Sequence, residues 1–387
     1  MSFLLGAFVS SFTGLSYAEL SASIPKAAAE YSYAKEAFQN RRVPFLVGWL
    51  IIFTEALSTA TVALGFSGYF RGLFGVPTLL SSITLIILLS VLNFIGIRES
   101  SRLNILFTAI EASGLMLIIL LGLPRLGRVD FLETPTGLSG ILRASTLVFF
   151  AYLGFEDIVN LAEESKDPER QIPKALILSV LITAVLYVLV AVSTVSLADW
   201  RQLGASEGPL AFAASRALGE NAYLVMSYIA LFATANTVLI LLIVTSRMIF
   251  GMARDGSLPK LLSKIHSKRG TPWIAILVSM LLSIFFVSFS NLEFVAGVTN
   301  FGTFITFATV NLVAIWLRYK RPEMRRPFKT PAIGKFPIVP VIGLFSCALM
   351  ITQFGPNVLI SGLSILGVGV ALQKLLSMKD ENEAGPS

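Results

Sequence analysis

Apolar segments of about 20 residues recur along the whole chain, separated by short polar connections. A helix of that length rises 1.5 Å per residue and so crosses the roughly 30 Å hydrocarbon core of a bilayer. The residues are 55% hydrophobic and only 14% charged, which is too apolar for an ordinary soluble domain. We therefore expect an all-α polytopic membrane protein with a single transmembrane domain over residues 1–387. Its eleven predicted spans are 3–22, 46–70, 78–97, 103–123, 138–162, 174–197, 222–248, 272–290, 295–317, 337–353 and 356–373.

Basic residues are concentrated in the connections on one side of the predicted membrane. If the C-terminus is cytoplasmic, every Lys and Arg lies on the inside except Arg71, Arg125, Arg128, Arg143, Arg201 and Arg216. Loops rich in Lys and Arg stay in the cytoplasm, so the asymmetry predicts this orientation and, with eleven spans, an N-terminus outside. The same blocks account for the net charge of +7, and no nucleic-acid partner is expected.

Sequence patterns for catalysis or cofactor binding are not found. A lone Cys347 in an apolar run excludes an intrachain disulfide, and a lone His266 cannot form a metal site with other histidines. The sequence has no phosphate-binding glycine loop of the Walker type and no nucleophile elbow. No enzyme activity, cofactor or metal site is therefore expected.

The stretch 138–175 departs from the pattern of an uninterrupted span. Glu156 and Asp157 follow Gly154 where a lipid-spanning helix should still be apolar, and an ionised acid at that depth costs roughly 2.5 to 3.5 kcal/mol. Gly154 is placed to open the helix, which would free backbone groups to coordinate the charged ends of a substrate. The alternative is that the span ends at Phe155 and the two acids form a solvated helix end.

Four separated motifs occur in a fixed order along the chain. They are 17–33 with Gly48-Trp49, 154–173 from Gly154-Phe155-Glu156 onward, 247–272 with Ala253-Arg254-Asp255-Gly256, and 318–331 with Arg326-Pro327-Phe328. Together they resemble the amino acid-polyamine-organocation (APC) superfamily of transporters over nearly the whole chain. The resemblance implies an inverted-repeat fold of five plus five helices followed by two more.

The resemblance also divides the chain into parts. Residues 3–123 correspond to the remainder of the first repeat, 138–317 to the second, 337–373 to the two additional helices and 374–387 to a cytoplasmic tail. Only four spans precede the opened helix, so the family's first helix is expected to be missing, and truncation of the sequence is the favoured explanation. About 11 transmembrane helices, family helices 2–12, are thus expected.

Candidate substrate-binding residues follow from the resemblance, position by position. Phe150, Ala151, Tyr152, Gly154 and Phe155 fall on the family's unwound segment, where backbone groups hold an amino group and an aromatic side chain closes over the substrate. Phe150 is the expected gate, with plain core packing as the alternative. In the seventh span, Asn236 with Thr234 and Thr237 would line the site, with hydrogen bonding between helices as an equally weighted alternative.

Three acids in apolar surroundings are candidates for proton coupling, namely Glu55, Glu111 and Glu156. Intramembrane carboxylates are rare, costly and usually functional. Glu111 is the leading candidate, because burial among leucines and phenylalanines would keep it protonated near neutral pH. A second hypothesis for Glu111 is that it binds a cation with help from Thr234, Thr237 and Asn236. The alternative for Glu55 and Glu111 is a protonated acid that serves packing alone.

The predicted function is secondary active transport of amino acids across the cell membrane by alternating access. The expected partners are an amino acid, a proton, with sodium the less favoured ion, and the lipid bilayer; symport and exchange both stay open. The basic loops 247–272 and 318–336 are read as a solvated cytoplasmic face. The alternative from a different class is a non-transporting membrane protein, either a nutrient sensor or a remnant of a permease.

Overall fold

The computed structural model describes residues 1–26, 28–127, 129–206, 208–289 and 291–383. Within these residues, nine helical segments are long and apolar enough to cross a membrane. Two shorter apolar helices, Trp273–Val287 and Ile338–Ile351, occupy the other two predicted spans. Pro272 and Pro337 stand immediately before them, where proline favours the start of a helix. Each predicted span therefore contains helix in its described residues, and the span 138–162 is interrupted between Tyr152 and Glu156.

Helices make up almost all of the regular structure in the described part of the chain. They are α1 (Ser2–Ser23), α2 (Ala29–Ala37), α3 (Arg42–Phe74), α4 (Thr78–Ile95), α5 (Ile97–Gly122), η1 (Leu123–Arg125), α6 (Gly137–Val148), η2 (Phe149–Tyr152), η3 (Glu156–Glu164), α7 (Pro168–Leu197), α8 (Trp200–Ala205), α9 (Pro209–Leu218), α10 (Glu220–Arg254), η4 (Lys260–Ser263), α11 (Trp273–Val287), α12 (Leu292–Lys320), α13 (Ile338–Ile351) and α14 (Pro356–Glu383).

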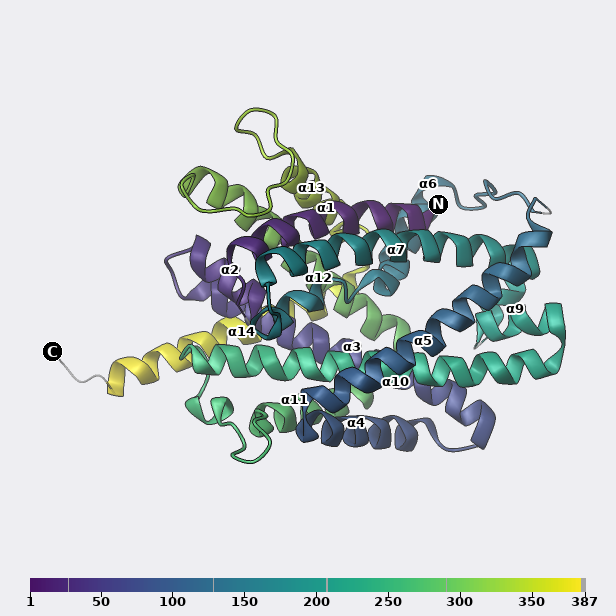
Figure 1. The fold of residues 1–387 in the computed structure, drawn as a ribbon, viewed down its shortest axis with the longest axis horizontal. Coiled ribbons are helices and arrows are strands. Elements are labelled where there is room, and N and C mark those ends of the chain that lie inside the picture. Colours follow the sequence, from purple (N-terminus) through teal and green to yellow (C-terminus); the bar gives the residue numbers. More distant parts are fainter. Residues whose placement is uncertain (27, 128, 207, 290, 384–387) are drawn as a thin grey trace.

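The long helices form one bundle with their axes roughly along its longest dimension (Figure 1). α1 runs beside α7, and α3 packs along both α10 and α12. The start of α1 and the far end of α14 lie at opposite ends of the bundle, as an odd number of spans requires. The short helix α2 lies at the same end as the last turns of α10 and α14, which is the end where the sequence places the cytoplasmic loops.

Small residues let α2 and α10 approach closely. A Cβ atom on Gly251 of α10 would lie 2.7 Å from the Cβ of Ala28, so only glycine fits there. Ala28 itself has a φ of 50°, which is uncommon for a residue with a side chain, and it is the N-cap residue immediately before α2. This contact packs α2 against the bundle, and the next residues, Ala29 and Glu30, are buried.

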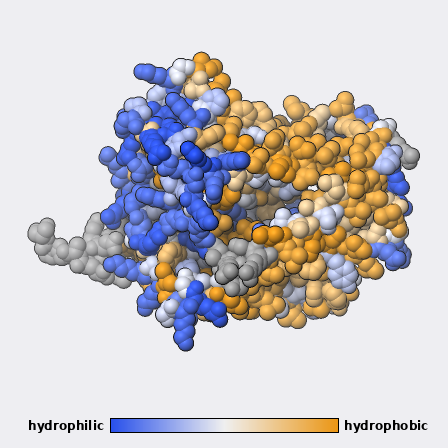
Figure 2. Space-filling view, viewed as in Figure 1, coloured by the Kyte–Doolittle hydropathy of each residue, from blue (hydrophilic) through white to orange (hydrophobic). Residues whose placement is uncertain are grey.

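Side-chain polarity divides the surface into an apolar belt and a hydrophilic end. Figure 2 shows hydrophobic residues over most of the bundle and hydrophilic ones gathered at the end that contains α2. Large apolar side chains such as Ile105, Leu181 and Phe345 are at least half exposed. A contiguous apolar surface of this kind suits lipid rather than water.

Candidate functional site

The predicted opening of the helix at Gly154 is confirmed by the backbone. α6 tightens into η2, Leu153 takes an extended conformation, and Gly154 has a φ of 106° before η3 begins at Glu156. Residues with a side chain rarely adopt that φ, so glycine makes this turn possible. The amide of Gly154 donates a hydrogen bond of 3.0 Å to the Glu156 carboxylate, which holds the turn closed on one side.

The two acids that follow the turn are buried. Glu156 is 7% exposed and Asp157 is 6% exposed. The alternative of a solvated helix end after Phe155 is therefore wrong. The chain continues as η3 instead of leaving the bundle, because Val159 and Ala162 pack into an apolar cluster with Tyr17 and Phe307.

Four carboxylates meet beside this turn and define the acidic chamber: Glu30 of α2, Glu55 of α3, and Glu156 and Asp157 of η3. The chamber encloses about 10 Å³, which is near the lower limit for a single water molecule and far too small for an amino acid. Polar and aromatic side chains complete its walls. They are Tyr17, Thr54, Asn160, Thr303, Thr306 and Phe307, with Ile51 beside them.

Hydrogen bonding within the acidic chamber is incomplete. Asn160 accepts a bond of 2.9 Å from the amide of Ala29 and donates a longer one of 3.4 Å to Glu30. One carboxylate oxygen of Glu55, Oε2, is buried and has no hydrogen-bond partner in the described part of the chain. Burial raises the pKa of Glu30 to about 7, although the bond from Asn160 opposes the shift. No Lys, Arg or His is among the described residues that line the chamber, so its acids lack a counter-ion.

The aromatic residues around the turn divide into a packed group and a more open one. Tyr152 is buried, donates a 2.8 Å hydrogen bond to the carbonyl of Phe3, and lies against Tyr187 with ring centroids 5.2 Å apart. Phe155 contacts Tyr17 and Phe307. These contacts hold the unwound segment against α1, α7 and α12.

Phe150 and Ala151 lie on the more open side of the unwound segment. Ala151 is exposed and Phe150 is partly exposed, whereas the neighbouring Phe149 is fully buried with its ring 4.4 Å from that of Phe304. Phe149 is thus the aromatic that packs the core here. Phe150 has the accessibility that a gate needs, and its role as a gate stays a prediction.

Two of the predicted site residues lie apart from the acidic chamber. Asn236 is buried between α10 and α5, where it accepts from Asn104 at 3.1 Å and donates to Thr108 at 3.2 Å. Thr234 and Thr237 donate to carbonyls of their own helix. Glu111 of α5 is partly buried and does not line the chamber. The structure therefore brings Glu55 and Glu156 together and leaves Asn236 and Glu111 outside, with hydrogen bonding between helices observed for Asn236.

Comparison with known proteins places the chain in a family. Residues 1–368 match the family model described as amino acid permease. The chain belongs to the amino acid permease family. It is 28% identical to the branched-chain amino acid permease BcaP of Bacillus subtilis, across 98% of this chain and 85% of that protein. It is 27% identical to the methylthioribose transporter of the same organism, across 98% and 86%. It is also 28% identical to the vacuolar cationic amino acid transporter 4 of Arabidopsis thaliana, across 84% and 58%.

Membership of this family and the apolar helices together establish the class of the protein. It is an amino acid permease with an all-α APC fold and a multi-pass integral protein of the cell membrane. The named relatives are permeases and transporters, and none favours the alternative of a non-transporting sensor or remnant.

Sequence reasoning missed Glu30 and Asn160 as members of the site. Both lie in the motif segments 17–33 and 154–173, but Glu30 lies outside every predicted span and near Lys26 and Lys35, a position typical of a solvated loop. The hydrogen bond between Asn160 and Glu30 joins residues 130 positions apart in the chain. No periodicity in the sequence points to that pairing.

The prediction that loop 318–336 is a solvated face is wrong for two of its arginines, Arg318 and Arg326. The side chains of Arg318 and Arg326 are 6% and 9% exposed, and both reach Glu19 of α1. The Nε of Arg318 donates to Glu19 at 2.8 Å, and the amide and hydroxyl of Thr330 donate to it at 2.8 and 2.9 Å. We call this group the Glu19 cluster. It ties the loop after α12 to α1 because the buried carboxylate needs these donors.

Proposed function

We propose that this permease couples amino acid movement to protons carried by the acidic chamber. The observation that supports the proposal is the convergence of Glu30, Glu55, Glu156 and Asp157 in a buried space with no basic side chain on its described walls. Like charges brought close together disfavour one another's ionisation, and burial disfavours every one of them. The chamber would therefore hold protons on its acids, or it would bind another cation in their place.

The distribution of the acids over separate elements supplies a route to coupling. Glu156 and Asp157 belong to η3, whereas Glu30 belongs to α2 and Glu55 to α3. If the unwound helix shifts against α2 and α3 as the permease changes the side to which it opens, the distances between these carboxylates change with it. Proton affinity then differs between the two states, and by linkage that difference drives uptake.

The substrate itself is assigned to the open side of the turn rather than to the acidic chamber. The chamber holds at most one water molecule, whereas Ala151 and Gly154 are exposed. Backbone groups at an interrupted helix can bind the charged ends of an amino acid. Protons and substrate would thus occupy adjacent sites joined by Gly154 and Glu156.

Uptake into proteoliposomes, measured with and without an imposed pH gradient, tests the proposal. Glu55→Gln and Glu156→Gln keep the side-chain size but cannot release a proton. We expect both variants to lose gradient-driven accumulation while retaining exchange of amino acid across the membrane. Labelled leucine and lysine are both supplied, because the named relatives include branched-chain and cationic amino acid transporters.

Two further variants make the outcome specific. Glu133→Gln alters an exposed acid in the α5–α6 connection and should leave accumulation unchanged. Glu111→Gln tests the acid that the sequence favoured as carrier. Loss of accumulation in Glu111→Gln alone, with Glu55→Gln and Glu156→Gln behaving like the parent, would move the coupling site to α5. If a sodium gradient at constant pH drives accumulation, the coupling ion is sodium and not the proton.

A further inference from the structure

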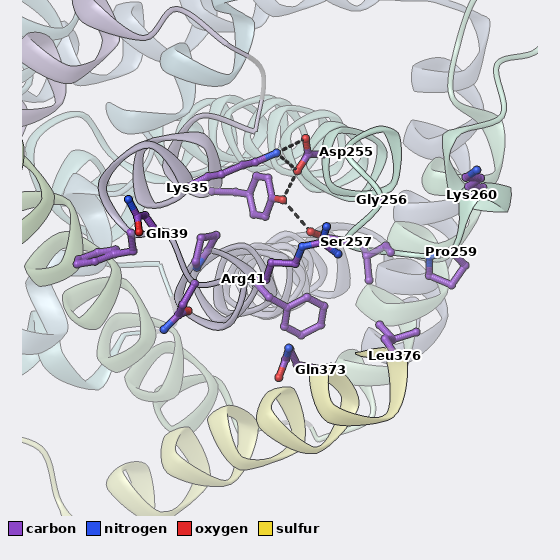
Figure 3. A pocket seen from close by; sticks show the side chains of 16 residues that line it. Lys35, Gln39, Arg41, Asp255, Gly256, Ser257, Pro259, Lys260, Gln373 and Leu376 are labelled. Atoms are coloured by element: carbon purple, nitrogen blue, oxygen red, sulfur yellow. Dashed lines mark hydrogen bonds and ion pairs between the residues drawn. The ribbon is translucent and has the colours of Figure 1, made fainter. Parts of the chain in front are cut away.

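A larger cavity lies at the hydrophilic end of the bundle, away from the acidic chamber. It has a volume of about 580 Å³ and lies between the α2–α3 connection, the segment after α10, and the last turns of α14. Figure 3 shows Lys35 and Asp255 on one side of it and Gln373 and Leu376 of α14 on the other. Its charged lining residues are Lys35, Arg41, Asp255 and Lys260, and we call it the basic pocket.

The single acid of the basic pocket is already neutralised. Lys35 donates to both carboxylate oxygens of Asp255, at 2.6 and 2.7 Å, and the Tyr31 hydroxyl donates to the same group. The Tyr31 hydroxyl also shares a 2.7 Å hydrogen bond with Ser257. The charge of Lys35 is therefore already paired with Asp255. Because this pairing compensates the charge of Asp255, the carboxylate repels an incoming anion only weakly.

Arg41 and Lys260 are the uncompensated charges of the basic pocket. Neither has a carboxylate partner within 4.0 Å among the residues that the structure describes. Both side chains belong to exposed residues, so a ligand can reach them. The amides of Gln39 and Gln373 supply further hydrogen-bond donors on the walls. This combination of two cations and neutral donors fits an anion with several acceptor oxygens.

The position of the basic pocket along the membrane normal identifies the source of that anion. The span Arg42–Phe74 begins at the pocket, and the spans Glu220–Arg254 and Pro356–Leu376 end beside it. Three spans thus enter or leave the hydrocarbon region at this level, on the side where basic loops gather. That is the level of the headgroups of the inner leaflet, where anionic lipids attract basic residues.

The remaining walls suit the part of a lipid next to its phosphate. Phe45, Leu258 and Leu376 give the basic pocket apolar surfaces adjacent to its charged ones. A free phosphate ion has no apolar groups to pack against such surfaces, whereas a phospholipid can bury its glycerol and first methylene groups there. We propose that the basic pocket binds the phosphate headgroup of an anionic phospholipid of the inner leaflet through Arg41 and Lys260. The site is separate from the acidic chamber, so this proposal stands or falls independently of proton coupling.

Lipid binding to the purified permease tests the proposal. Native mass spectrometry after incubation with phosphatidylglycerol or phosphatidylcholine measures retained lipid, and inorganic phosphate and glycerophosphoglycerol form the soluble arms. We expect selective retention of phosphatidylglycerol, and an apparent affinity about 30-fold weaker in Arg41→Gln/Lys260→Gln, since each basic residue at the surface contributes about a 5-fold gain. The matched control, Lys268→Gln/Arg269→Gln, removes the same charge from an exposed loop outside the basic pocket and should bind like the parent.

Three results would overturn the proposal. Equal phosphatidylglycerol binding by Arg41→Gln/Lys260→Gln and the parent would remove these residues from the site. An equal loss in Lys268→Gln/Arg269→Gln would reduce the effect to general surface charge. Competition by inorganic phosphate or glycerophosphoglycerol at the concentrations at which the lipid binds would show a site for a free phosphate compound instead.

Discussion

The acidic chamber and the Glu19 cluster both contain buried carboxylates beside or within α1, but only the carboxylate of the Glu19 cluster is paired with basic side chains. Tyr17 lines the chamber, and Glu19, two positions later, is 2% exposed and bound to Arg318, Arg326 and Thr330. In the chamber, Glu55 keeps an unpartnered oxygen, and no basic residue is among the described residues that line it.

The contrast distinguishes a buried acid that stabilises the fold through an ion pair from one that is free to bind and release a proton or another cation. A buried ion pair is costly to break because removing one partner strands the other charge. Buried acids without a counter-ion stabilise nothing by being charged, and they persist in membrane proteins mainly where protons or ions are handled. Substitutions at the two sites should therefore have opposite consequences for stability and for transport.

The largest effect is expected from Glu19→Gln. This change leaves the buried guanidinium of Arg318 without its carboxylate, and breaking a buried pair costs about 3 to 5 kcal/mol. The unfolding temperature of the purified permease should fall steeply. Glu55→Gln, which removes an acid with no counter-ion, should leave that temperature unchanged or raise it.

A second-site change checks that stranded charge is the cause. Removing the main partner of Glu19 as well, in Glu19→Gln/Arg318→Met, should recover part of the lost stability, because the guanidinium of Arg318 is then no longer left as an uncompensated buried charge. A double variant as unstable as Glu19→Gln would instead attribute the loss to the contacts of Glu19 with Arg326 and Thr330.

The next effect concerns the pH dependence of stability at Glu30. Burial raises its pKa to about 7 from the ordinary 4.5 of a glutamate, so the folded state holds the proton more tightly than the unfolded state. Stability from this group is fully present below about pH 4.5, declines as the pH rises and is lost above about pH 7, by up to about 3 kcal/mol in total. Glu30→Gln should flatten the unfolding temperature between pH 5 and 8. An unchanged slope would mean that Glu30 is not the group responsible.

A smaller effect is expected at the turn that positions Glu156. Gly154→Ala places a side chain at a φ of 106°, which costs about 1 to 3 kcal/mol, although no atom lies closer than 3.7 Å to the new Cβ. Transport should fall together with stability because the unwound segment is displaced. Gly65→Ala is the matched control, since it lies within α3 with open space around it and should be neutral or slightly stabilising. Equal behaviour of the two variants would remove the special role of the turn.

The smallest effect is expected at Asn236. Its hydrogen bonds to Asn104 and Thr108 join α10 to α5 outside the acidic chamber, and such bonds between membrane helices contribute about 0.6 kcal/mol on average. Asn236→Ala should therefore lower the unfolding temperature slightly and leave the KM for amino acid unchanged. A raised KM with unchanged stability would restore Asn236 to the substrate site.

Much of this arrangement could be predicted from local sequence. The nine long apolar helices of the described chain, and the two shorter ones, could be predicted because a bilayer demands about 20 apolar residues per helix, whatever the neighbouring helices do. The opening at Gly154 was recognisable because a glycine precedes two acids inside an apolar run. Each of these signals is contained in a single segment.

The grouping of the acids was decided only by tertiary packing. Glu55, Glu111 and Glu156 look alike in the sequence, since each is an acid among apolar neighbours, yet only Glu55 and Glu156 line the acidic chamber. Glu30 and Glu19 look alike as well, both lying in the segment 17–33, but one joins the chamber and the other meets Arg318. Hydropathy determines which residues cross the membrane. The charge state and the function of a buried acid depend instead on which side chains, distant in the sequence, the packed helices place beside it.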